Sequence, residues 1–390
     1  MTGRRLEYLA APLVLFNLVC FVVPILSIIF FAAHSPEFVD VFPDTSRKLN
    51  SWDQQTLPSE DVFLTFVQEL DKAAQDRTLP DAARRLNYEI SGYKSLLSKT
   101  GRVAQDLRPP YREAMIGIDQ RWADVNYWKV AASASHRYTT LFLLTALDFK
   151  KNADGSIAYA RQDERVYLAT LLRTFWMAFV VTAICVSLAY PIAFLMAGAS
   201  PIMARVLLAL VMIPFWMSLL VRTAAWMVLL QKDGLVNQLL SGLGVIEQPI
   251  QLIFNRTAVY LALVHIMLPF AILPIFSAMR SISTDYLRAA ASLGARPTRA
   301  FVEIYMPQTL PGVAAAALLV FILTIGFYIT PALLGGPKDQ MISYIIAQFA
   351  GQNANWGMAG ALALLLIVSV AVITSMASAL RMSRSKRAGR

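Results

Sequence analysis

The stretch "YLRAAASLGARPTRAFVEIYMP", Tyr286 to Pro307, decides how this chain is organised. It lies between two long apolar runs, yet it is rich in alanine and arginine and ends on a proline. Ser283 is placed to cap a helix over 284–293, and Gly294 suits the left-handed residue that ends a helix. Pro297 then begins a second helix, which closes before the final proline. The pattern predicts a helix–turn–helix whose alanine face lets another protein approach closely.

The composition places the chain in a membrane. Of its 390 residues 57% are apolar, which is well above the level of soluble globular proteins. A helix needs about 20 consecutive apolar residues to cross a bilayer core, and six runs have that length. We therefore expect an all-α polytopic membrane protein with six transmembrane helices. The six runs are Leu9–Ala33, Tyr167–Met196, Ile202–Leu230, Val259–Met279, Val313–Leu334 and Met358–Leu380.

The distribution of charge predicts which side of the membrane each loop faces. Residues 35–165 contain 18 basic and 19 acidic residues, whereas the rest of the chain contains 17 and 6. With the N-terminus inside, the short inner segments hold twelve basic residues and the short outer loops hold three. This asymmetry follows the positive-inside rule. We expect both termini and the segment 280–307 to face the cytosol, and 35–165 to lie outside.

Residues 35–165 form a polar, charge-balanced insertion that is long enough for a small domain of its own. Three amphipathic patterns predict helices within it, and no catalytic or metal-ligand cluster is visible. We interpret the insertion as a structural or docking element, with ligand sensing as the alternative. The apolar positions of the three patterns are Phe63, Phe66, Val67, Leu70 and Ala74, then Leu86, Ile90, Tyr93 and Leu97, and then Met115, Ile118, Trp122 and Val125.

The opening stretch resembles the EAA loop of the permeases of binding-protein-dependent ABC importers, whose pattern is E-A-A-x(3)-G-x(9)-I-x-L-P. Arg288 stands where the family has its glutamate, so that contact is not carried over, and Asp285 one turn earlier is the candidate substitute. In that family the first helix inserts into a cleft of the ATPase, which implies that 284–294 couples this chain to an ATPase partner. The positions that match at the right spacing are Ala289, Ala290, Gly294, Ile304 and Pro307.

Further segments resemble the spermidine/putrescine branch of these permeases, and together they cover almost everything except the insertion. The resemblance implies a bacterial-type inner-membrane permease core over 166–380. The remaining parts are 1–34 with the cytosolic N-terminus and first span, the outer insertion 35–165, and a basic cytosolic tail 381–390. The segments are Leu171–Ala197, Ile213–Leu240, Gly326–Ile342 and Asn355–Leu366.

The resemblance also implies partners: an ABC ATPase dimer, a second permease subunit (a related chain or a second copy) and an extracytoplasmic solute-binding protein. The solute it implies is a polyamine such as spermidine or putrescine, with another small cationic or polar solute as the alternative. Neither a nucleic acid nor a cofactor is expected, since the chain lacks the G-x-x-x-x-G-K-[ST] phosphate loop and ATP would be bound by the partner.

Candidate residues for the substrate path are polar or aromatic positions in the spans that match the family's core helices: Trp216, Trp226, Tyr328 and Thr330. Aromatic faces attract ammonium groups, although anchoring at the membrane interface is the alternative for Trp and Tyr. Arg222 would repel a polyamine if it lined this path, and His265 is expected to be a packing residue.

Three other classes of protein are alternatives to this interpretation. A membrane enzyme would need His, Asp, Glu, Ser or Cys clustered at one depth, and no such cluster is visible, so we expect no catalytic or metal-binding residues. A proton-coupled transporter places ionisable groups in the middle of its spans, where this chain has no acidic residue. A membrane-bound sensor that uses the 35–165 domain is the alternative that the sequence leaves open.

Overall fold

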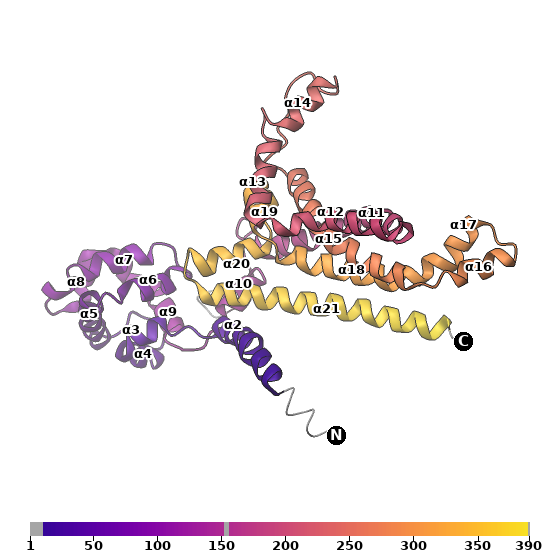
Figure 1. The fold of residues 1–390 in the computed structure, drawn as a ribbon. Helices are drawn as coiled ribbons and strands as arrows, with labels where there is room; N and C mark the ends of the chain where they lie inside the picture. Colours follow the sequence, from indigo (N-terminus) through magenta and orange to yellow (C-terminus); the bar gives the residue numbers. More distant parts are fainter. Residues whose placement is uncertain (1–10, 152–155, 389–390) are drawn as a thin grey trace. The chain divides into compact units, whose positions relative to one another are not determined.

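The computed structural model describes residues 11–151 and 156–388, which are mostly helical (Figure 1). They form two compact units. Unit 1 contains the chain up to Arg165 together with Ala354–Leu365, and unit 2 contains Val166–Asn353 and the remainder of the C-terminal helix. The expected cytosolic residues 1–10 and the last two residues of the basic tail lie outside the described residues.

Unit 1 combines two apolar helices with a small helical bundle. The apolar helix Ala11–Ala33 contains a π-helical turn, η1 (Leu18–Val22), and ends as α2 (Val23–Ala33). The second apolar helix is the start of α21 (Trp356–Ala388). A short antiparallel hairpin, in which Lys150 pairs with Ala158, departs from the expected all-α fold. The bundle and hairpin consist of α3 (Glu37–Val41), α4 (Pro43–Asn50), α5 (Glu60–Gln75), α6 (Leu79–Asn87), α7 (Tyr93–Gly101), η2 (Ala104–Asp106), α8 (Tyr111–Ile118), η3 (Gln120–Ala123), α9 (Val125–Ala134), α10 (Leu141–Ala146), β1 (Phe149–Lys151) and β2 (Ile157–Tyr159).

An aromatic core holds this bundle together. Trp122 and Trp128 are fully buried, and their rings lie 5.3 Å and 5.4 Å from the ring of Phe66. Each indole N–H has a partner: Trp122 donates to the Thr100 hydroxyl, and Trp128 donates to the carbonyl of Trp122. Buried tryptophans need such partners, and so the bundle closes without an orphaned indole.

Only the first of the three expected amphipathic helices is confirmed as one continuous helix, α5. The second pattern was expected to run through 86–97, but Gly92 at φ +93° separates α6 from α7. The third is divided because Asp119 is extended and its carboxylate accepts a hydrogen bond from the Arg121 backbone N–H, which ends α8 and caps η3. Left-handed glycine and an aspartate cap are both strong helix boundaries.

Unit 2 is built around three long helices, α11, α15 and α18, whose buried residues form one apolar cluster. Small residues bring two of these helices very close together, since a Cβ at Gly312 of α18 would collide with the Cβ of Ala278 on α15. Close packing at small residues is the usual means by which membrane helices associate. The elements of this unit are α11 (Tyr167–Gly198), α12 (Pro201–Trp216), α13 (Leu219–Leu230), α14 (Leu235–Gly242), α15 (Arg256–Ser281), α16 (Asp285–Ser292), α17 (Pro297–Ala300), η4 (Phe301–Tyr305), α18 (Met306–Gly326), α19 (Ile329–Leu334), η5 (Pro337–Asp339) and α20 (Ile342–Gly351).

Five described helices are long and apolar enough to cross a membrane, and a sixth crossing arises if one bent pair counts as a single span. That pair is α12 with Leu219–Gly242, which meet at 93°. The expected third span, Ile202–Leu230, therefore corresponds to a bent pair of helices rather than to one continuous helix. Pro214 removes one backbone donor near the end of α12, and the Ser218 hydroxyl caps α13 by accepting from the Val221 N–H at 3.2 Å.

The expected fifth span, Val313–Leu334, is also divided. Its first part, α18, ends at Gly326, where Phe327 turns to an extended conformation. Pro331 has no N–H to donate to the carbonyl of residue 327. Helix α18 therefore does not continue into α19, which begins at Ile329. The residues around both breaks, between α12 and α13 and between α18 and α19, are apolar. Hydropathy alone therefore predicts one span in each case.

Candidate functional site

The helix α16 ends in a hydrogen-bonded glycine cap. Gly294 has φ +80°, and its N–H donates to the Ala291 carbonyl at 2.9 Å. The next N–H, that of Ala295, donates to the Ala290 carbonyl at 3.0 Å. These two bonds are the Schellman motif, which satisfies the last carbonyls of a helix and needs a left-handed residue at the position of the glycine. The expected left-handed Gly294 is thus present.

Helix α16 has one face toward the protein and one toward solvent. Ala290 is buried and Leu287 packs against the apolar core of unit 2. On the other side Tyr286 is 56% exposed and Leu293 is 88% exposed, with the small Ala289 between them. An apolar stripe left in solvent beside a residue without bulk has the character of a docking surface. We call Tyr286, Ala289 and Leu293 the exposed stripe of α16.

Two charges lie at the start of α16. Asp285 and Arg288 are one turn apart, 3.6 Å separates the Arg288 Nη1 from the Asp285 Oδ1, and both side chains are about four-fifths exposed. The Asp285 N–H also donates to the Ser283 hydroxyl at 3.2 Å, so Ser283 supports the first turn from one position before Thr284, the residue at the N-cap. The family pattern has a glutamate at the position of Arg288. In this chain that position is basic, and the neighbouring carboxylate is that of Asp285.

The second half of the loop is continuous with the next apolar helix, which corrects the expected boundary at Pro307. Helix α17 begins at Pro297 and passes through the π-helical turn η4 directly into α18. At the join the Met306 N–H donates to the Phe301 carbonyl, five residues earlier. A π-helical turn changes the hydrogen-bond register, and so the missing N–H of Pro307 leaves no break in the helix.

Aromatic packing fixes this half of the loop to unit 2. The ring of Phe194, near the end of α11, makes edge-to-face contacts with Phe301 at 5.3 Å and Tyr305 at 5.7 Å. Tyr305 is buried and the matched Ile304 is half-buried. Packed side chains therefore connect the loop to α11, and the continuous helix connects it to α18. Figure 1 shows α16 and α17 as a projection at the end of α18.

The candidate path residues lie in different surroundings. Trp216, at the bend after α12, is 89% exposed, and Tyr328, between α18 and α19, is 42% exposed. Thr330 is buried, with its hydroxyl 3.2 Å from that of Thr223. Trp226 donates its indole N–H to His265 Nδ1 at 3.2 Å. The structure brings Thr330 to α13 and Trp226 to α15, but it does not gather all four side chains at one point.

The pairing of Trp226 with His265 is a feature that sequence reasoning missed. The two residues are 39 positions apart, and only the packing of α13 on α15 brings them together. A second long-range contact was also missed: Arg256 Nε donates to Asp339 Oδ1 at 2.9 Å. This ion pair joins the start of α15 to η5. Neither pair has a local sequence signal.

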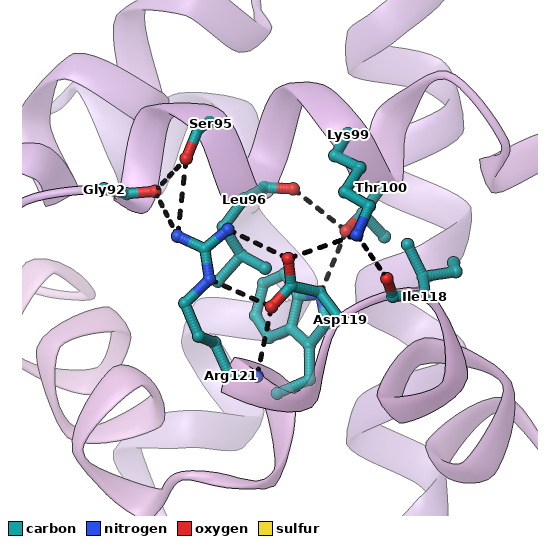
Figure 2. Close-up of polar contacts among 9 residues, drawn as sticks. Gly92, Ser95, Leu96, Lys99, Thr100, Ile118, Asp119 and Arg121 are labelled. Atoms are coloured by element: carbon teal, nitrogen blue, oxygen red, sulfur yellow. Dashed lines mark hydrogen bonds and ion pairs between the residues drawn. The ribbon is translucent and has the colours of Figure 1, made fainter.

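Unit 1 contains a well-formed polar cluster of its own (Figure 2). The guanidinium of Arg121 donates from Nε and Nη2 to the two oxygens of Asp119, each at 2.9 Å, and from Nη1 to the Gly92 carbonyl. Lys99 Nζ donates to the Ile118 carbonyl at 2.6 Å. These hydrogen bonds hold the pKa of the Asp119 carboxyl well below its usual range. Every charge in the cluster is engaged, which makes it a brace between α7 and η3.

The described residues offer no metal-binding group. Among residues 11–151 and 156–388, no three His, Cys, Asp or Glu side chains lie close enough together to hold an ion. Cys20 and Cys185 are both free thiols, the first exposed and the second buried.

Comparison with known families decides the class of the protein. The model of the family described as "Binding-protein-dependent transport system inner membrane component" matches residues 189–387, which is half of the chain. The chain belongs to this family of inner-membrane permeases. The matched part of the permease contains α16, the π-helical turn and all the candidate path residues, whereas the 35–165 insertion lies outside it.

Curated relatives of the permease are named spermidine/putrescine transport system permease protein PotB. The protein from Salmonella typhimurium (strain SL1344) is 36% identical over 188 residues, which are 48% of this chain and 66% of that protein. The protein from Haemophilus influenzae is 33% identical over 53% of this chain and 73% of its own length. A solved bacterial alginate ABC transporter aligns with a TM-score of 0.45 and 17% identity, over 55% of this chain and 77% of that one.

Proposed function

We propose that this permease forms half of the translocation path of an ATP-driven importer and is coupled to a separate ATPase through 284–307. The observation that carries the proposal is the exposed stripe of α16, on a loop whose second half packs against α11 through Phe301 and Tyr305. Leu293 places a whole apolar side chain in solvent beside a glycine cap, so the helix has an anchor and a fixed direction. A partner with an apolar cleft would bury that anchor.

The transmission of movement follows from the packing of the loop. Closure of an ATPase dimer around ATP would displace α16 as a rigid body, because its cap and its buried Ala290 leave it little internal freedom. Phe194 and Tyr305 then pass the displacement to α11 and α18. Such a lever suits an alternating-access mechanism, in which rigid elements rotate about a site between them.

The proposed arrangement places both termini and α16 in the cytosol and the bundle of unit 1 outside. Support comes from the basic residues of 280–307, which follow the positive-inside rule. The family description supports a binding protein as the donor of solute. We propose that it docks on the outer loops that Arg256 and Asp339 join, and that a second permease, related or identical, completes the path.

For the solute we propose a polyamine, because the PotB relatives carry spermidine and putrescine in their names. Trp216, Trp226 and Tyr328 would offer aromatic faces to its ammonium groups. Arg222 favours the second candidate, another small polar solute, since its Nε is buried without a hydrogen-bond partner among the described residues and its charge would repel a polyamine.

Transport by the reconstituted complex tests the proposal and separates the two solutes. Proteoliposomes that contain the permease, its ATPase and its second permease would be supplied with binding protein, ATP and labelled putrescine or spermidine. Uptake that needs ATP and is competed by unlabelled polyamine supports the proposal. ATP-dependent uptake of other polar solutes alone would overturn the polyamine assignment, and uptake that continues without the ATPase would overturn the coupling.

The membrane-bound sensor is the second candidate function, and the cavity in unit 1 described below is the observation in its favour. If the full chain bound a small solute tightly through unit 1 while no transport was detected, the sensor would replace the importer.

A further inference from the structure

A cavity of about 1080 Å³ opens in unit 1. Its wall includes Ala33, the last residue of the apolar helix α2, together with residues of α9, of the segment 136–141 and of β1. Sites for small organic molecules have volumes of about 300–1,000 Å³, so the space suits a ligand much larger than a bare ion. The family match does not cover this part of the chain.

The cavity is positively charged. Lys129, Lys150 and Lys151 line it, and Glu89 is the carboxylate among its lining residues. Glu89 is already engaged, since Arg85 Nη1 donates to it at 2.7 Å. Lys150 lies 3.6 Å from the Glu164 carboxylate, but the ammonium groups of Lys129 and Lys151 form no hydrogen bond or ion pair with a described residue. Two free ammonium groups around one space disfavour a polyamine and favour an anion.

Neutral donors complete the lining. Ser133 and Thr140 also line the cavity, and their hydroxyls have no hydrogen-bond partner among the described residues. Ammonium and hydroxyl groups together are the set of donors that a phosphate group accepts from. The charge and the donors therefore indicate an anionic ligand that carries phosphate.

The depth of the cavity relative to the bilayer is fixed by the end of α2. The Thr139 N–H donates to the Ala33 carbonyl at 2.8 Å, and the Ser35 N–H donates to the Arg137 carbonyl at 2.9 Å. These bonds fasten the rim of the cavity to the last turn of a membrane helix. Tyr138 is 68% exposed at this rim, and an exposed tyrosine beside the end of such a helix marks the headgroup level.

We propose that this cavity binds the phosphate headgroup of an anionic lipid, with Lys129 and Lys151 as its cationic ligands. The inference rests on the proposed function only in that α2 spans the membrane. It gives the insertion a task that is separate from ATP coupling: a headgroup held there ties the outer domain to the bilayer surface.

Native mass spectrometry of the full chain, released from nanodiscs of equal parts phosphatidylglycerol and phosphatidylcholine, tests the proposal. The variant is Lys129→Gln with Lys151→Gln. The charge-matched control is Lys72→Gln with Lys94→Gln, two lysines outside the cavity. Each lysine near an anionic surface contributes about fivefold to the affinity for an anionic lipid. The variant is therefore expected to bind phosphatidylglycerol about 25-fold more weakly, whereas the control should match the wild type.

Two results would overturn the proposal. Equal retention of phosphatidylglycerol by the variant and the control would show that the two lysines do not bind it. Complete displacement of the lipid by millimolar inorganic phosphate, with phosphate bound in the same lysine-dependent way, would show that the ligand is the free anion. Co-purification of the ATPase is scored in the same samples, because its absence from the wild type would count against the importer and not against the cavity.

Discussion

Gly294 donates its backbone N–H to the carbonyl of Ala291 at 2.9 Å while its own φ is +80°. That conformation costs a residue with a side chain about 1–2 kcal/mol, although a Cβ at this position would have no neighbour within 4 Å. We expect Gly294→Glu to abolish ATP-driven uptake, because it strains the cap and places a charge at the docking turn. Gly294→Ala tests the strain alone and is expected to retain part of the activity.

The control for this pair is Gly242→Glu, at the end of α14, where a side chain also has open space and φ is not positive. Uptake by the reconstituted complex is the measurement. If Gly294→Glu transported as fast as the wild type, the assignment of α16 to coupling would be wrong.

Leu293 is expected to act as an anchor for the ATPase. Because the side chain is 88% exposed in the permease, Leu293→Ser should change the stability of the permease itself by no more than about 0.5 kcal/mol. Burial of a leucine at an interface contributes about 2 kcal/mol, which corresponds to roughly thirtyfold in affinity. Titration of the ATPase onto the immobilised permease measures this loss, with Leu243→Ser as an equally apolar, 76% exposed control. Equal losses of affinity for the ATPase in both variants would contradict a special role of Leu293.

Gly360 is expected to be essential for the packing of the two apolar helices of unit 1. A Cβ at this position would lie 2.5 Å from the Ile28 carbonyl oxygen and 3.1 Å from the Ala32 nitrogen, both of which are backbone atoms that cannot rotate away. Gly360→Ala should therefore destabilise the chain by about 1–3 kcal/mol. The thermal unfolding midpoint in detergent reports the change. Gly117→Ala, in open space on α8, serves as the control, and a Gly360→Ala midpoint no lower than the control would contradict the close crossing.

Asp119 is expected to make the outer domain sensitive to acid. Its pKa in the folded protein is held below the usual range by the Arg121 hydrogen bonds, so its stabilising contribution is present above about pH 4 and is lost as the pH falls below that value. Asp119→Asn should lower the free energy of unfolding by about 1 kcal/mol at neutral pH, since the pair is partly exposed. It should also make the loss of stability at acid pH less steep. Unfolding midpoints across the acid range measure both effects. If Asp119→Asn lost stability at acid pH as steeply as the control Asp76→Asn, the assignment to Asp119 would be refuted.

The helix and glycine cap of 285–294 were predictable because their signals are local. A run of alanines followed by glycine specifies a helix and its left-handed cap within ten residues, and the structure has both at Ala290 and Gly294. The boundary at Pro307 was wrongly predicted, since proline usually ends a helix and a sequence pattern does not reveal the π-helical turn that accommodates it.

The remaining differences come from competition between local and tertiary forces. The break at Met217–Ser218 lies within apolar composition that is typical of one span, and it depends on a cap that becomes useful only once the helix has bent. The contact of Trp226 with His265 depends on how α13 packs against α15, and no spacing in the sequence encodes it. The cavity beside Ala33 likewise gathers residues from segments more than a hundred positions apart.

Affinity purification of the full chain in a mild detergent, with the bound proteins identified by mass spectrometry, shows most directly whether α16 joins the permease to an ATPase. The wild type, Gly294→Glu and the control Gly242→Glu would be compared. We expect an ABC ATPase to accompany the wild type and the control and to be lost from Gly294→Glu. An ATPase bound equally to all three, or absent from all three, would contradict the assignment of α16 as the coupling helix.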